Sequence, residues 1–100
     1  MKIYKEKQKR KRHKFDEIPD FSVYSDTTRR LLVNLWDAPK RMLSHEDIRE
    51  YVILDEYASN KAIERVVAKA REAIAQNHFP YEIKNVWGKG YCLEQKRGGN

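Results

Sequence analysis

Two short runs of strand-forming residues near the C-terminus fold back on each other over a pair of glycines. The runs span residues 81–86 and 91–93, and Gly88 and Gly90 lie between them. Glycine readily takes the backbone angles that a tight hairpin turn requires. A long amphipathic segment, residues 61–76, comes directly before them. The sequence therefore predicts a helix followed by a closing hairpin, an order that suits either a nucleic-acid-binding domain or an ordinary small α+β domain.

The size and composition of the chain exclude several classes of protein. A chain of 100 residues forms one domain with a modest core. No apolar stretch approaches the roughly 18 residues of a membrane span, and the N-terminus is charged where a secretory signal is apolar. Cys92 is the only cysteine, and His13, His45 and His78 lie at no metal-ligand spacing from it. We expect a cytoplasmic protein without a membrane partner, disulfide, metal site, cofactor, catalytic residues or enzyme activity.

The positive charge of the chain is concentrated in residues 1–14. The whole chain carries +6, of which this arm holds +7 and the remainder −1. A segment with so much like charge buries little apolar surface, so we expect the arm to be disordered when free. Basic side chains that neutralise phosphates release counterions, which favours nucleic acid as the partner over a merely solubilising tail. The arm residues that we assign to DNA are Lys7, Lys9, Arg10, Lys11, Arg12 and Lys14.

The rest of the chain predicts a short strand, three helices and the hairpin, within a domain spanning residues 15–95 and followed by a flexible tail, residues 96–100. Phe21, Val23 and Tyr24 suggest the strand. The first helix begins at about residue 25 and ends before Pro39. Residues 44–47 resemble a capping box, so the second helix begins at about His45 and runs to residue 52. Residues 54–59 form a connecting loop to the third helix, 61–76.

The third helix has one apolar face and one basic face. Its apolar residues fall on one side at 100° per residue: they are Ile63, Val66, Val67, Ala70 and Ile74. Arg65 and Lys69 lie opposite, flanked by Glu72 and by the small residue Ala68, which would let the helix backbone approach a major groove. Glu64 and Glu72 share this face, so a solvated face of mixed charge is the alternative interpretation.

The order of elements and several motifs resemble the C-terminal DNA-binding domain of the OmpR/PhoB family of bacterial response regulators. The resemblance rests on Arg30, Leu31, Leu32, Leu35, Pro39, Arg41, Met42, Leu43, Ser44, Glu46, Ile48, Glu50 and Val52, then on Ile63, Val67, Lys69, Arg71 and Ile74, and finally on Val86, Gly88, Gly90, Tyr91 and Leu93. It implies an α+β winged helix-turn-helix fold, with three helices and a C-terminal hairpin wing. It also implies sequence-specific binding to double-stranded DNA, with the third helix in the major groove and the wing at the adjacent minor groove.

The sequence departs from this family in several places. Only 25 residues precede the first helix and most belong to the basic arm, so we expect the family's N-terminal sheet to be truncated. The chain leaves no room for a receiver domain, so we expect a stand-alone domain. Between Val86 and Gly88, where many members carry an Arg that reaches into the minor groove, this chain has Trp87, and Lys89 would take over the backbone contact. An indole carries no charge, so the basic arm would have to restore affinity.

These observations favour a small bacterial or phage transcriptional regulator that acts in the cytoplasm at the nucleoid, is a monomer in solution and is able to pair on DNA. Its predicted DNA contacts are Lys61, Arg65, Ala68, Lys69 and Arg71 on the third helix and Trp87 and Lys89 in the wing. The alternative is a protein-binding adaptor or inhibitor of the transcription machinery with only non-specific DNA affinity. In that case RNA polymerase or another transcription protein would contact Asp55, Glu56 and Tyr57, in the loop that family members use for this purpose. Structured RNA is a third partner that charge permits, although no aromatic stacking platform is present.

Overall fold

The computed structural model describes residues 19–96. Its elements follow in the order α2 (Asp26–Asp37), η1 (Pro39–Arg41), β1 (Met42–Ser44), α3 (His45–Asp47), η2 (Ile48–Ile53), α4 (Asn60–Gln76), β2 (Tyr81–Val86) and β3 (Gly90–Gln95). Three helical regions and a closing hairpin confirm the predicted α+β fold. The predicted arm, residues 1–14, lies outside the described residues, and so does the predicted tail apart from Lys96.

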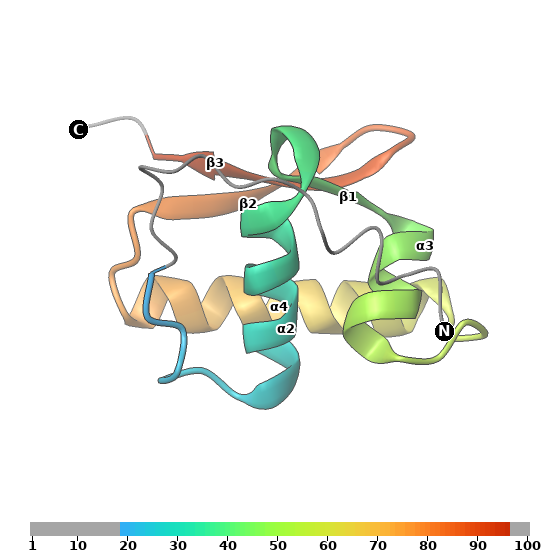
Figure 1. Ribbon diagram of the computed structural model, residues 1–100, viewed down its shortest axis with the longest axis horizontal. Helices are drawn as coiled ribbons and strands as arrows, with labels where there is room; N and C mark the ends of the chain where they lie inside the picture. Colours follow the sequence, from blue (N-terminus) through green and yellow to red (C-terminus); the bar gives the residue numbers. More distant parts are fainter. Residues whose placement is uncertain (1–18, 97–100) are drawn as a thin grey trace.

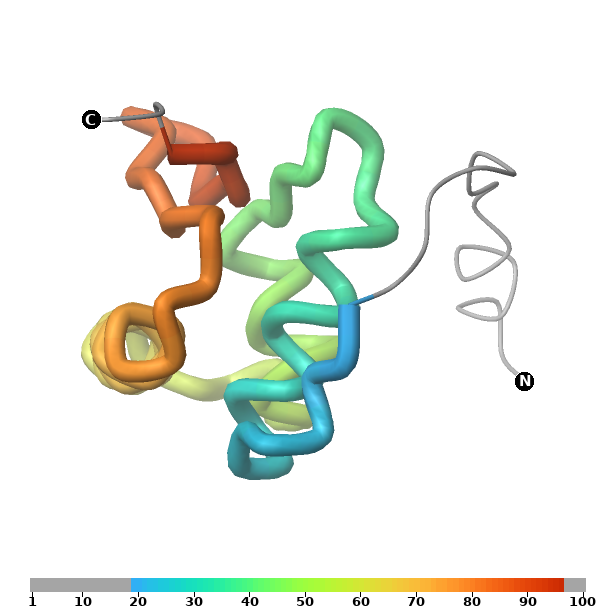
Figure 2. Tube along the Cα trace, turned by 90° about the vertical axis from the view of Figure 1, so that its left-hand side faces the viewer, coloured from blue at the N-terminus to red at the C-terminus, as the bar shows by residue number. Residues whose placement is uncertain are grey.

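The helices and the sheet form two layers. Figure 1 shows the sheet above α4, with α2 crossing in front of α4. The sheet has three antiparallel strands in the order β1-β3-β2. Seen along the axis of α4 in Figure 2, the sheet lies above that helix and α2 lies to its right. The other side of α4 faces away from the domain.

The core fills the space between these layers. Its fully buried side chains are mostly aliphatic and come from all three helical regions and β1: they are Leu31, Leu32, Leu35, Leu43, Ile48, Val52, Ile63 and Val67. Ile83 and Leu93, which pair across the hairpin, close the core from the sheet side. Each such side chain stabilises the fold by about 1.5–3 kcal/mol relative to an exposed one. The apolar face of the third helix is thus confirmed as the core face.

The local start signals of the second and third helices act as predicted. Ser44 Oγ accepts a hydrogen bond from the Asp47 backbone nitrogen at 3.0 Å, and the Asp47 carboxylate accepts one from the Ser44 backbone nitrogen at 3.2 Å. This is the complete capping box. Ser59 Oγ accepts from the Ala62 backbone nitrogen at 3.1 Å and caps α4. These bonds satisfy backbone donors that have no partner within a helix.

The hairpin turns where the glycines predict, and a third strand joins it. β2 pairs with β3 from Tyr81 opposite Gln95 to Val86 opposite Gly90. β1, which the sequence indicated only as an extended link, pairs with the other edge of β3 and places Ser44 opposite Gly90. A Cβ atom at Gly90 would lie 2.0 Å from the Leu43 carbonyl oxygen. This position therefore requires glycine because another strand passes against it.

The predicted strand at Phe21, Val23 and Tyr24 is wrong. The segment forms a turn, closed by a hydrogen bond of 3.1 Å from the Tyr24 backbone nitrogen to the Phe21 carbonyl oxygen. Phe21 and Tyr24 are both buried whereas Val23 is exposed, and the Phe21 ring packs on the ring of Phe79. Phe21 and Tyr24 are three positions apart, and in a strand their side chains would point to opposite faces. A turn lets both point into the core. We expected the family's N-terminal sheet to be truncated. Residues 19–25 contain no strand, so they contribute nothing to such a sheet.

Candidate nucleic-acid interface

The helix predicted to read DNA, α4, packs against the core on one side and is exposed on the other. Its buried residues recur at helical spacing and are Ile63, Val67, Ala70 and Ile74. The outer side, at the left in Figure 2, is covered by no other segment of residues 19–96. All five predicted contacts of this helix are exposed: Lys61, Arg65, Ala68, Lys69 and Arg71. A 17-residue helix held in this way is free to enter a groove.

Arg65 and Lys69 share one flank of α4 with the beginning of α2. Together with Ser25, Thr27 and Thr28 they line a hollow of about 380 Å³. Thr28 is buried, whereas Ser25 is exposed and its side chain makes no cap hydrogen bond. Two cationic groups and hydroxyl donors on one flank are the groups that bind phosphate oxygens. The structure thus brings together two of the predicted contacts and adds three residues at the start of α2 that the sequence did not assign to DNA.

The opposite flank of α4 faces the wing and is more acidic. Glu64 and Asn60 line a hollow of about 260 Å³ with Asn85, Trp87 and other residues of α3 and the hairpin. The basic groups Arg65 and Lys69 do not line it. A phosphate placed in this hollow would be repelled by Glu64, whereas a cytosine amino group would find an acceptor there. The two flanks of α4 therefore differ in charge.

Arg71 makes a structural contact that its predicted role did not include. Its Nε donates a hydrogen bond of 3.0 Å to the Ile83 carbonyl oxygen in β2. Its guanidinium carbon lies 5.8 Å from the ring centroid of Tyr91 in β3, within the range of a cation–π contact. The side chain thus ties α4 to the hairpin. It is set apart from Arg65 and Lys69, which lie on the other flank.

The tip of the wing presents Trp87 to solvent. Its side chain is 91% exposed, the highest value among the large hydrophobic residues in the described part of the chain. The turn is closed by a hydrogen bond of 2.9 Å from the Lys89 backbone nitrogen to the Val86 carbonyl oxygen, and Gly88 adopts a φ of 75°. Lys89 is exposed beside it. Trp87 therefore does not pack beneath the wing.

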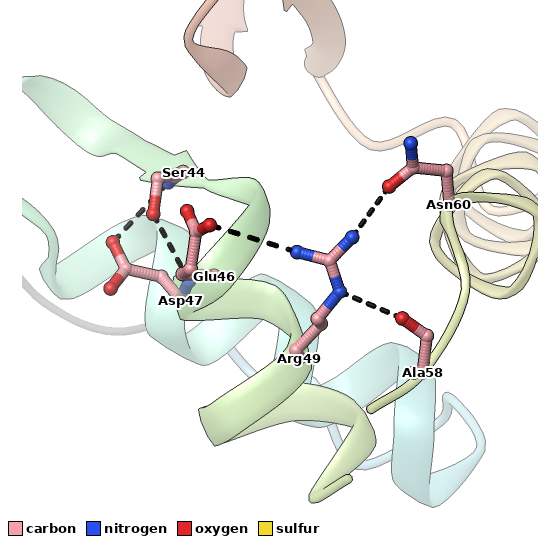
Figure 3. Close-up of polar contacts among 6 residues, drawn as sticks. All are labelled: Ser44, Glu46, Asp47, Arg49, Ala58 and Asn60. Atoms are coloured by element: carbon pink, nitrogen blue, oxygen red, sulfur yellow. Dashed lines mark hydrogen bonds and ion pairs between the residues drawn. The ribbon is translucent and has the colours of Figure 1, made fainter. Parts of the chain in front are cut away.

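The loop between η2 and α4 is held by Arg49, a residue that the sequence did not single out. Figure 3 shows the Arg49 guanidinium between this loop and the first residue of α4. Its Nε donates to the Ala58 carbonyl oxygen at 2.7 Å, and Nη2 donates to Asn60 Oδ1 at 2.5 Å. Glu46 lies 3.9 Å from Nη1 as a weaker ion-pair partner. These bonds fix the orientation of the Asn60 amide at the start of α4.

The three predicted partner contacts lie on this same loop. Leu54 begins it with a left-handed backbone, φ 66°, and the Asp55 carboxylate accepts a hydrogen bond of 2.9 Å from the Tyr57 backbone nitrogen. Asp55 and Glu56 are exposed, Tyr57 is 87% exposed and Leu54 is 63% exposed. The loop is thus an ordered turn that carries two acidic and two apolar groups outward.

The charge of the described residues is balanced. Residues 19–96 contain 12 basic and 12 acidic side chains. These residues have no net positive charge to attract a polyanion. Any affinity that they have for one must therefore come from basic side chains that are grouped on one surface. Within these residues no three His, Cys, Asp or Glu side chains are placed to hold a metal ion, and none of the helices is long and apolar enough to cross a membrane.

The helices, the exposed outer face of α4 and the hairpin that follows it define a winged helix-turn-helix domain. The chain matches the family described as "Transcriptional regulatory protein, C terminal" over residues 23–93. It belongs to this family, the OmpR/PhoB-type DNA-binding domains of transcription regulators, as its motifs indicated. The family is one of DNA-binding regulatory domains and not of enzymes. No curated protein sequence matches the chain.

Proposed function

We propose that the protein binds double-stranded DNA sequence-specifically, as a small transcriptional regulator of bacterial or phage type that acts at the nucleoid in the cytoplasm. The observation that carries this proposal is the outer face of α4, which is uncovered and bears Lys61, Arg65, Ala68 and Lys69. Ala68 leaves room for the helix backbone to approach base edges. The domain is a monomer in solution and two copies pair on a direct repeat.

The two flanks of α4 have different tasks in this proposal. Arg65 and Lys69, with the hydroxyls of Ser25 and Thr27, bind phosphates of one strand and set the position of the helix. Glu64, on the wing-facing flank, accepts from a cytosine amino group. Support comes from the two separate hollows, one lined by basic and hydroxyl groups and the other by Glu64.

The arm, residues 1–14, supplies the non-specific part of the affinity. Its net charge is +7 whereas residues 19–96 are neutral, and each neutralised phosphate contributes about 0.9 to the slope of log affinity against log salt. Deletion of residues 1–14 should lower affinity and flatten this slope by several units. An unchanged affinity and slope would show that the folded domain alone provides the binding energy.

Selection of bound duplexes from a random pool tests specific binding. The full chain is incubated with the pool at about 150 mM salt, and the bound fraction is sequenced over successive rounds. Enrichment of one motif, repeated in the same direction, is expected for paired domains. A control selection with the isolated arm peptide, residues 1–14, should enrich no motif. Failure of the full chain to enrich any motif would overturn the proposal.

A second candidate function is binding to a transcription protein such as RNA polymerase. Tyr57 and Leu54 favour it, because two large apolar side chains are exposed on a loop that Arg49 holds in place. Asp55 and Glu56 lie between them and would pair with basic groups of the partner. The test is Tyr57→Ala, which should leave DNA affinity unchanged and reduce activated transcription in a reconstituted assay. Unchanged transcription would remove this loop from any partner contact.

A further inference from the structure

Trp87 is an unusual residue to expose. Tryptophan contributes a large apolar surface, and such side chains are usually buried or placed at interfaces. Trp87 is 91% exposed, while Trp36, the other tryptophan, packs against the core. The side chain therefore contributes little to the stability of the domain. The exposure of Trp87 therefore needs an explanation other than core packing, and the residues around it indicate a role in binding.

The wing presents this indole on a stiff support. The turn that carries Trp87 is closed by the hydrogen bond between Lys89 and Val86. Immediately after the turn, β3 is paired on both edges, with Val86 of β2 and Ser44 of β1 opposite Gly90. A side chain on such a support loses less conformational freedom on binding than one on a loose loop, which favours its use as an anchor.

The surroundings of Trp87 disfavour a phosphate and favour a less charged surface. The hollow that Trp87 lines toward α4 also contains Glu64, Asn85 and Tyr91. Glu64 repels phosphates, and the indole supplies one donor and no positive charge. Lys89, exposed on the other side of Gly88, is the group at this tip that suits a phosphate. An indole beside a single cation fits the minor groove, because the deoxyribose rings of its walls can contact the indole while Lys89 reaches a phosphate at its edge.

We propose that Trp87 is a non-ionic wedge that packs against deoxyribose and a base step in the minor groove next to the segment that α4 reads, and that it bends the duplex there. This inference rests on the proposed DNA binding and specifies how the wing takes part in it. Apolar side chains that enter a minor groove partly unstack a step and kink the helix axis. Pyrimidine–purine steps deform most easily, so one should occur at this position of the site.

Three variants test the wedge on the duplex that the selection yields. Trp87→Ala should weaken binding about tenfold, in the range of one lost base-stacking contact, with the salt slope unchanged because no charge is lost. Trp87→Phe should retain most of the affinity. Lys89→Ala is the matched control at the same turn, and it should lower the salt slope by about 0.9.

Bending is measured separately, by energy transfer between dyes at the two ends of the duplex. The wild-type complex should bring the ends closer than the free duplex, and the Trp87→Ala complex at saturating protein should not. Iodide quenching of Trp87 fluorescence, taken as the difference between wild type and Trp87→Phe, should fall when DNA binds.

The outcomes separate the wedge from the function on which it rests. Full affinity and full bending by Trp87→Ala would overturn the wedge and leave DNA binding intact. Unaltered iodide quenching on DNA binding would do the same. Failure of the wild-type chain to bind any duplex would overturn the proposed function itself.

Discussion

Arg49, in η2, is joined to Ala58, the residue before the Ser59 cap of α4, by a hydrogen bond of 2.7 Å from its Nε to the Ala58 carbonyl oxygen. The same guanidinium bonds Asn60, so one side chain sets both the exposed loop and the first residue of α4. This relationship means that the two surfaces proposed for binding, the loop and the helix, are not positioned independently.

Arg49→Ala should destabilise the domain and loosen the loop. The lost charged hydrogen bonds correspond to about 1.5–3 kcal/mol, and amide hydrogen exchange should accelerate over residues 55–60. The measurements are urea unfolding and residue-resolved exchange. Glu50→Ala, at the exposed neighbouring position, is the control and should change stability by less than about 0.5 kcal/mol. Equal effects of the two substitutions would contradict a positioning role for Arg49.

Gly90→Ala should be far more damaging than Gly88→Ala. Gly90 has a φ of 155°, and a Cβ atom there meets the Leu43 carbonyl oxygen at 2.0 Å, so β1 and β3 could not pair without moving apart. We expect a loss of roughly 3 kcal/mol or more. A Cβ at Gly88 meets nothing within 4 Å, and only its φ of 75° carries a cost, about 1–2 kcal/mol. Thermal unfolding of both variants measures the difference, and similar melting temperatures would refute it.

Arg71→Met should reduce stability as well as any DNA affinity. The substitution removes the hydrogen bond to Ile83 and leaves that carbonyl oxygen without this partner, at a cost of about 1–2 kcal/mol. Arg65→Met, on the other flank of the same helix, should change stability by less than about 0.5 kcal/mol. Urea unfolding in the absence of DNA compares the two. A larger loss for Arg65→Met would mean that Arg71 is chiefly a DNA contact.

Alkaline pH should destabilise the domain through Cys92. Burial raises the pKa of this thiol above its ordinary value of 9.0, the Glu94 carboxylate raises it further, and Lys84 opposes the rise. The folded state therefore holds the proton more tightly, so its contribution to stability is complete below the pKa of the unfolded thiol. It is lost as pH rises through the folded value. Cys92→Ala should show a smaller decline in urea midpoint from pH 8 to 10 than wild type, and identical declines would contradict this assignment.

The sequence predicted those parts of the fold that depend on local chemistry. The capping box at Ser44, the two faces of α4 and the hairpin around Gly88 all follow from spacing and turn preference, and all are present. The strand at Phe21 was wrong because tertiary packing with Phe79 favours a turn. Apolar residues in a segment this short do not by themselves distinguish a strand from a turn.

The features that the sequence did not predict are contacts between distant residues. The pairing of β1 with β3 and the bond from Arg71 to Ile83 join segments without any local signal. Arg49 likewise reaches Ala58 only because the chain reverses at Leu54, a left-handed residue that is not glycine. The split of the basic residues between two flanks of α4 depends on where α2 and the wing lie, which helical periodicity cannot specify.

The most direct test of the central claim is the salt dependence of binding to the selected duplex when two charges are removed from α4. Arg65→Gln with Lys69→Gln should weaken binding and lower the slope of log affinity against log salt by about 1.8, two phosphate contacts at 0.9 each. The matched control, Lys40→Gln with Lys84→Gln, removes the same charge from η1 and β2 and should leave that slope nearly unchanged. Equal slopes for the two double variants would contradict the claim that α4 lies against the DNA.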